Sequence, residues 1–104
     1  MTSDASLDRA LHAIADPTRR RILLVLKDRG SEIKFAGEKA VHGPCLCGGE
    51  IEERIRLSQP TISHHMNILT KAGLVEATKQ GQWRWYRRNE KAIREVVKTL
   101  RGKL

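Results

Sequence analysis

The sequence contains few of the features that stabilise or direct secreted and membrane proteins. Its two cysteines, Cys45 and Cys47, are too close together to link distant elements, as the disulfides of small secreted proteins do. No apolar run is long enough to span a bilayer, and residues 1–6 lack the basic and apolar regions of a secretory signal. We therefore expect a cytoplasmic protein with reduced thiols and no membrane partner.

Acidic residues are also scarce relative to basic ones. Asp and Glu number 12 against 20 Lys and Arg, so the formal net charge is +8. This surplus favours a polyanionic partner, with nucleic acid first, although a merely basic protein remains the alternative. No Ser-His-Asp set, carboxylate pair or phosphate-binding loop is recognisable, so we do not expect an enzyme. A thiol oxidoreductase or metal-transfer protein that uses the two cysteines is the competing class.

The length and the hydrophobic pattern predict one domain at 1–104 that is mainly α with a small β-hairpin. With 104 residues and 39% hydrophobic content, the chain can build one modest core. Helical spacing, glycines and alternation give the expected elements. In chain order these are a first helix at about 4–15, a second at about 17–28, an irregular segment at 29–49 with room for a strand at 33–36, a helix-turn-helix at about 50–72, a wing at about 75–88 and a last helix at about 90–104.

Capping residues mark where these helices begin. Asp16 followed by Pro17 ends the first helix and opens the second. Glu50 opens a short third helix, whose apolar positions are Ile51, Ile55 and, at its end, Leu57. Ser58 caps the fourth helix, which tolerates Pro60 in its first turn. Three consecutive arginines, Arg19 to Arg21, crowd the first turn of the second helix, where the helix dipole disfavours cations. We expect them to serve packing, an acidic neighbour or DNA phosphates.

The fourth helix has the pattern of a DNA recognition helix. Ile62, Met66 and Leu69 recur at helical spacing and predict its buried face. The opposite side and the N-terminal turns then carry side chains suited to base edges or phosphates, namely Gln59, Thr61, Ser63, His64, Asn67 and Lys71. An ordinary solvated face is the alternative for each residue alone. The joint pattern favours a winged helix-turn-helix fold that binds double-stranded DNA.

The expected hairpin, which turns at Gln80-Gly81, supplies further cations. Lys79 and Arg84 are placed to contact the DNA backbone or to enter the minor groove. Trp83 and Trp85 alternate with arginines, and we expect at least one of them to pack inside the fold, with base stacking on single strands as the alternative.

Two apolar stripes lie on the terminal helices, Leu7-Leu11-Ile14 and Ile93-Val96-Val97-Leu100. A monomer of this size would expose too much of them, so we expect a homodimer formed through the N- and C-terminal helices. Its two recognition helices would bind a palindromic operator. The alternative is that the stripes pack on each other within one chain.

Three segments together resemble the ArsR-SmtB family of winged-helix repressors. Residues 15–23, Ala-Asp-Pro-Thr-Arg-Arg-Arg-Ile-Leu, resemble the opening of the family's second helix, and residues 57–66 with Gly73-Leu74-Val75 resemble its recognition helix. Gly81-Gln82-Trp83 with Tyr86-Arg87 resembles its wing. The resemblance covers most of the chain. It implies a homodimeric repressor that occupies a promoter and is released by an inducer.

The Cys45-Leu46-Cys47 segment resembles the Cys-x-Cys pair that arsenic-sensing members carry before the recognition helix. Two thiolates suit As(III), Sb(III) or another thiophilic ion as inducer, and His42 would complete a His-x-x-Cys-x-Cys set. The pair lies slightly upstream of the family position, Glu50 stands where a third cysteine would follow, and residues 90–104 lack the His or Cys of the family's zinc site. A strained Cys-x-Cys disulfide acting as a redox switch, and a regulator that needs no ligand, are the alternatives.

Overall fold

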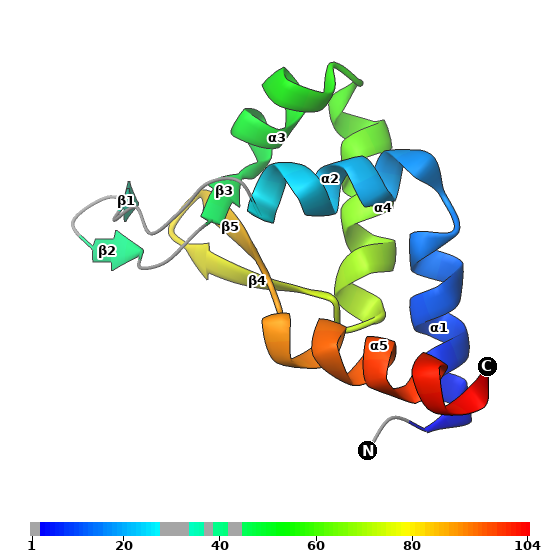
Figure 1. Cartoon of the computed structure of the whole chain (residues 1–104). Coiled ribbons are helices and arrows are strands. Elements are labelled where there is room, and N and C mark those ends of the chain that lie inside the picture. The colour runs from blue at the N-terminus through cyan, green and yellow to red at the C-terminus, as the bar shows by residue number, and fades with distance from the viewer. Residues whose placement is uncertain (1–2, 28–33, 37–38, 42–44) are drawn as a thin grey trace.

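The structure, a computed structural model, describes residues 3–27, 34–36, 39–41 and 45–104 (Figure 1). Five helices occur in these ranges, and they are α1 (Asp4–Ile14), α2 (Pro17–Lys27), α3 (Gly48–Ile55), α4 (Gln59–Lys71) and α5 (Glu90–Lys103). None of these helices combines the length and the apolar character that crossing a membrane requires. The predicted fold class is confirmed: the molecule is mainly α and carries a β-hairpin after its helix-turn-helix.

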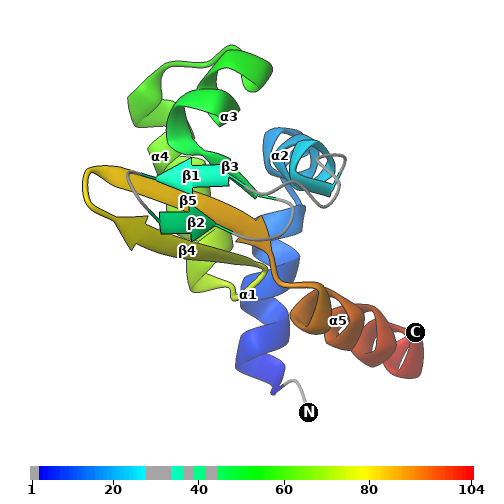
Figure 2. The same cartoon turned by 90° about the vertical axis from the view of Figure 1, so that its left-hand side faces the viewer.

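Two small antiparallel sheets complete the described part. In one, β1 (Lys34–Ala36) pairs with β2 (Lys39–Val41). In the other, β5 (Trp83–Arg88) lies between β3 (Cys45–Cys47) and β4 (Val75–Gln80). Figures 1 and 2 show the β1–β2 sheet on the side of the molecule away from α1 and α5. The wing is therefore a three-stranded sheet rather than a hairpin alone.

The expectation for segment 29–49 was right in one part and wrong in the rest. A strand had room at 33–36, and β1 occupies 34–36. The segment also holds β2 and β3, which we did not expect, and α3 already begins at Gly48, before Glu50. Strands of three residues are too short to show alternation, and β3 exists through its pairing with β5, which lies about 40 residues farther along the chain. The Glu50 carboxylate accepts the Cys47 N–H at 3.2 Å, so Glu50 supports a helix start that lies upstream of it.

Two local boundaries also differ from the expectation. The hairpin turns at Gly81-Gln82, one residue later than predicted, because Gln80 still pairs with Trp83 and Gly81 takes the left-handed φ of 61°. At the end of α3, Arg56 adopts a φ of 62°, which stops the helix before Leu57 and leaves that leucine exposed. Leu57 is therefore not part of the third helix.

The core lies between the helices and one face of the three-stranded sheet. Leu46 and Tyr86 face each other on β3 and β5 and join this core with Ile22, Leu26 and Met66. Because side chains alternate along a strand, their neighbours point to the other face of the sheet. Cys45 and Trp85 form a separate buried cluster there, against which Cys47 packs.

Candidate nucleic-acid interface

Helix α4 turns its apolar side to the core and its polar side outward, as predicted. Ile62, Met66 and Leu69 are buried at 3% exposure or less. His64, Asn67 and Lys71 are exposed along the opposite side, and Gln59 and Thr61 are exposed at the N-terminal end, while Ser63 is half-buried. The helix therefore leaves a polar face that a nucleic acid can reach.

The first turns of α4 hold their polar side chains in fixed positions. Ser58 occupies the N-cap position, but its hydroxyl bonds to the Thr61 hydroxyl at 2.9 Å instead of to a backbone N–H. One turn along, the Gln59 side-chain amide donates to the Ser63 hydroxyl at 2.8 Å. The polar groups at the entry of α4 are thus held by one another before any ligand binds.

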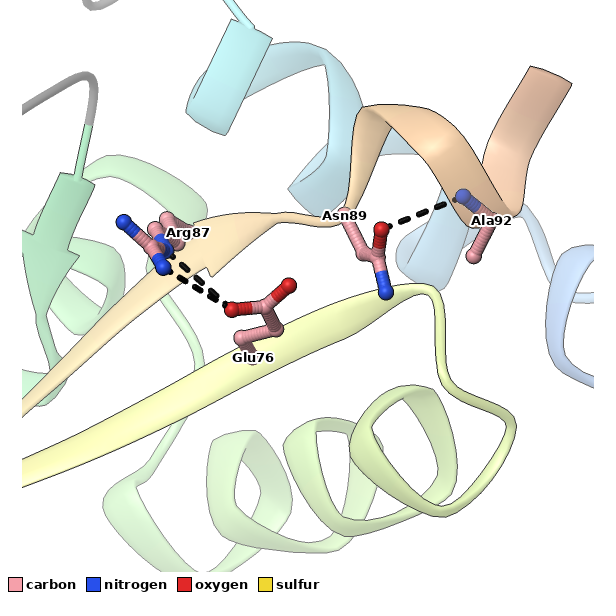
Figure 3. A network of polar contacts seen from close by, with 4 residues as sticks. All are labelled: Glu76, Arg87, Asn89 and Ala92. Carbon is pink, nitrogen blue, oxygen red and sulfur yellow. Dashed lines mark hydrogen bonds and ion pairs between the residues drawn. The ribbon is translucent and has the colours of Figure 1, made fainter.

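The wing places like charges opposite each other. Lys79 on β4 pairs directly with Arg84 on β5, and both side chains are exposed. Like charges at directly opposite positions destabilise a sheet, whereas an opposite-charge pair supports it. The same two strands do carry such a complementary pair, Glu76 with Arg87 at 3.0 Å (Figure 3). The Lys79–Arg84 pair therefore lowers the stability of the free protein and is suited to bind a polyanion.

The aromatic residues of the wing divide between packing and exposure. Trp85 is buried at 6% exposure and Tyr86 at 8%, which confirms that at least one tryptophan packs inside the fold. Trp83 is 43% exposed, and its ring centroid lies 6.3 Å from that of Trp85. The buried rings hold the sheet on both faces, and Trp83 stays at the surface near the turn.

A hollow of about 440 Å³ lies between α3, α4 and the wing. Three predicted DNA-contacting residues line it, Gln59, Ser63 and Arg84. Cys47 and Trp83 line the same hollow, a neighbourhood that the sequence did not suggest because β3 was not foreseen. Lys71 lies elsewhere, in an apolar hollow of about 340 Å³ between α1 and the end of α4.

The cysteine pair occupies strand β3 and the start of α3. Cys45 is buried, Cys47 is half-buried, and the two are not joined by a disulfide. Residues two apart on a strand share a face, so both side chains lie on the Trp85 side of the sheet. Within the described ranges, no three His, Cys, Asp or Glu side chains form a group that could hold a metal. His42, the third predicted ligand, lies outside the described residues.

The arginines at the start of α2 bond to the ends of other helices. Arg20 donates to the Ile14 carbonyl at 2.7 Å at the end of α1, and Arg21 donates to the Arg54 carbonyl at 3.3 Å at the end of α3. Such carbonyls have no partner within their own helix, and cations are favourable beside them. This explains why cations stand where the dipole of α2 itself disfavours them.

Arg19 is the buried member of this group. At 7% exposure it donates to the Ala13 carbonyl at 2.7 Å, to the His12 carbonyl at 3.1 Å and to Nδ1 of His65 on α4 at 3.1 Å. Burial lowers the pKa of His65, and the positive charge of Arg19 adds to this effect against the opposing charge of Asp16. The Arg19 N–H donates to the Asp16 carboxylate at 3.0 Å, which keeps the pKa of Asp16 below its usual value.

Comparison with known proteins agrees with this geometry. Residues 14–78 match a family described as a helix-turn-helix domain. The uncharacterized HTH-type transcriptional regulator MJ1325 of Methanocaldococcus jannaschii is 40% identical over 88 residues, which cover 85% of this chain and 83% of that protein. Both matches are to helix-turn-helix proteins, and the second is to a transcriptional regulator.

Two further comparisons, one with an ArsR family structure and one with an arsenical resistance repressor, bear on fold and function. The crystal structure of an ArsR family transcriptional regulator, RHA00566, superposes with a TM-score of 0.74 at 20% identity, covers 97% of this chain and 88% of that one, and supports the fold. An arsenical resistance operon repressor of Staphylococcus aureus is 36% identical over 55 residues, 53% of each chain. The chain belongs to the ArsR family of winged helix-turn-helix transcriptional regulators. It is thus a DNA-binding transcriptional regulator, and its relatives are regulators rather than enzymes.

Proposed function

We propose that this regulator represses transcription by laying α4 in the major groove of its operator, with the wing on the adjacent backbone. The observation that carries the proposal is the exposed Lys79–Arg84 pair beside the open polar face of α4, since a polyanion bound there would offset its repulsion. In this arrangement the two wing cations and Lys71 bind phosphates. The remaining predicted residues of α4 contact the base edges, and these are Gln59, Thr61, Ser63, His64 and Asn67.

The experiment is a fluorescence anisotropy titration of a duplex from the promoter of the chain's own gene and of a scrambled duplex. Ser63→Ala with His64→Ala should weaken binding to the promoter and leave the weak binding to scrambled DNA unchanged. Arg84→Ala is the matched control for a phosphate contact, since it should weaken both duplexes alike and lower the salt dependence. Equal losses on both duplexes for the Ser63 and His64 variant would contradict base recognition by α4.

We also propose that residues 1–104 act as one unit that forms a homodimer on a palindromic operator. Part of the two terminal stripes packs within the chain, where Leu7 and Val96 are buried. Leu11, Val97 and Leu104 remain exposed, at 36%, 50% and 101%. Helices α1 and α5 lie side by side at one end of the molecule, and Lys103 of α5 lies 3.5 Å from Asp4 of α1 (Figures 1 and 2). A partner that covers this end would bury the exposed side chains and supply the second α4.

For the inducer we propose a thiophilic metalloid such as As(III) or Sb(III), bound through Cys45 and Cys47. Both thiols lie on one face of β3, and Cys47 lines the hollow that also contains Gln59, Ser63 and Arg84. A ligand on Cys47 would therefore occupy space beside predicted DNA contacts. The arsenical resistance repressor among the relatives supports the choice of ligand.

The inducer test is a DNA-release titration with As(III), Zn(II), Cd(II) and a mild thiol oxidant. We expect As(III) to release DNA from the parent protein and from neither Cys45→Ser nor Cys47→Ser. Release by the oxidant alone would favour the second candidate, a redox switch, which the proximity of the two thiols also permits. If both variants respond like the parent to every reagent, neither cysteine binds an inducer or acts as a redox switch. The remaining candidate is then a regulator that needs no ligand.

A further inference from the structure

The buried Arg19 connects α4 to α1 and α2. The Arg19 guanidinium bonds with three of its nitrogen atoms, Nε to the Ala13 carbonyl, Nη2 to the His12 carbonyl and Nη1 to the His65 ring. Its own backbone N–H is held by the Asp16 carboxylate. The side chain thus joins the end of α1, the start of α2 and the middle of α4.

The contact to His65 fixes the state of that ring. A guanidinium has donors only, so Nδ1 of His65 must accept and cannot carry a proton. The ring is therefore neutral, with its proton on Nε2, and adding a second proton would remove the acceptor and place two cations 3.1 Å apart. The contact exists in one protonation state of His65.

We propose that Arg19 is a positioning residue for DNA recognition, which fixes the rotation of α4 on the body of the protein through the neutral ring of His65. His64, a predicted base contact, directly precedes His65 on the same helix and lies on its exposed side. A rotation of α4 that lengthens the Arg19–His65 hydrogen bond would move His64 and Asn67 relative to the major groove of the operator. The inference rests on the proposed role of α4 in the operator.

The charged groups around His65 are few in the described part of the chain. Asp16 and Arg19 act on it from the start of α2, and His64 acts from α4 itself. From α1, two main-chain carbonyls reach the same cluster through Arg19. Asp16 favours a charged His65, whereas Arg19 and burial disfavour it, and the burial effect is the largest. Neutral pH thus favours the arrangement in which α4 is held.

The test compares the DNA affinity of four proteins as the pH is lowered from about 7.5 to about 5.5, across the ordinary pKa range of histidine. The proteins are the parent, His65→Gln, His65→Leu and His12→Gln. Glutamine keeps an acceptor but has no charge to gain, and leucine has no acceptor. His12→Gln is the matched control, because His12 is an exposed histidine outside α4 and the wing whose main-chain carbonyl, not its side chain, bonds to Arg19. Circular dichroism at each pH restricts the comparison to folded protein.

At neutral pH we expect His65→Leu to bind the promoter duplex about tenfold more weakly, since a hydrogen bond to a charged group is lost, while its binding to scrambled DNA is unchanged. His65→Gln should bind within a few-fold of the parent. On acidification the parent and His12→Gln should lose promoter affinity, and His65→Gln should lose less. Arg19→Lys, which keeps the charge but not the three-way contact, should behave like His65→Leu.

The positioning role is overturned if His65→Leu binds both duplexes like the parent, or if His65→Gln keeps the parent's full pH dependence. A loss of thermal stability in His65→Leu with unchanged promoter affinity would mean that the contact is only structural. A different result would show that α4 does not bind the operator at all. Asn67→Ala, on the exposed side of α4, would then leave promoter binding unchanged.

Discussion

Replacing Lys79 by glutamate should make the protein more stable and a weaker DNA binder. The substitution puts a carboxylate opposite Arg84, in the arrangement that Glu76 and Arg87 already have on the same strands. A cross-strand pair of opposite charge contributes about 0.2–1 kcal/mol, and the exposed Glu76–Arg87 pair indicates the lower half of that range. A gain of about 0.5 kcal/mol raises the Tm of a domain of this size by about 2–4 °C.

The effect on DNA follows from the lost phosphate contact. Each phosphate that a protein neutralises contributes about 0.9 to the slope of log affinity against log salt, which is worth nearly tenfold in affinity at about 0.1 M salt. We therefore expect Lys79→Glu to lower affinity by at least about tenfold per subunit and to reduce the slope by about one. The promoter and the scrambled duplex should be affected alike, because the contact we propose for Lys79 is to a phosphate and not to a base.

The assay pairs a thermal unfolding scan with anisotropy titrations at several salt concentrations. Lys98→Glu makes the same change of charge on α5, at an exposed position that belongs neither to α4 nor to the wing, and is the matched control. The control should leave the salt slope within error of the parent. Lower stability of Lys79→Glu, or an unchanged salt slope, would refute the view that the wing gives up stability for a phosphate contact.

Four further predictions concern the core, the dimer and the dependence of stability on pH. In a denaturant titration, Leu46→Ala should lower the free energy of unfolding by about 3 kcal/mol, because Leu46 is fully buried. The control Leu24→Ala, at a side chain that is 57% exposed, should change the free energy of unfolding by less than about 0.5 kcal/mol. Val97→Asp should raise the dimer dissociation constant at least about tenfold in sedimentation equilibrium, and an unchanged value would place the interface elsewhere. Because the pKa of His65 is lowered from 6.5, the unfolded chain binds the extra proton first, so stability should fall as the pH drops below 6.5, and His65→Gln should lack this part of the loss. Asp16, whose pKa is lowered from 3.8, should stabilise the fold above that value and lose this contribution at lower pH.

Local patterns predicted the parts of the site that lie on one helix. Ile62, Met66 and Leu69 repeat at helical spacing, so the direction of the polar side of α4 follows from the sequence and agrees with the structure. The excess of cations and the order of the helices likewise follow from residue types and spacing. These features depend on residues a few positions apart, which a linear reading can compare.

Contacts between distant segments could not be predicted in this way. Strand β3 forms because Leu46 meets Tyr86 of β5, and a strand of three residues has no period of its own that would mark it. The same pairing carries Cys47 to the hollow beside Gln59 and Arg84. The sequence marked Arg19 only as a cation at the wrong end of a helix, and its real partners belong to two other helices.

The amino-acid sequence alone thus determined that the chain is basic and folds into helices, one of which has a polar outer face, because periodicity and charge are properties of neighbouring residues. Only the tertiary structure decided that β3 joins the wing, that Cys47 lies beside the predicted DNA contacts and that Arg19 holds α4 through His65. Such arrangements depend on which distant surfaces exclude water together and on which buried polar groups find partners there.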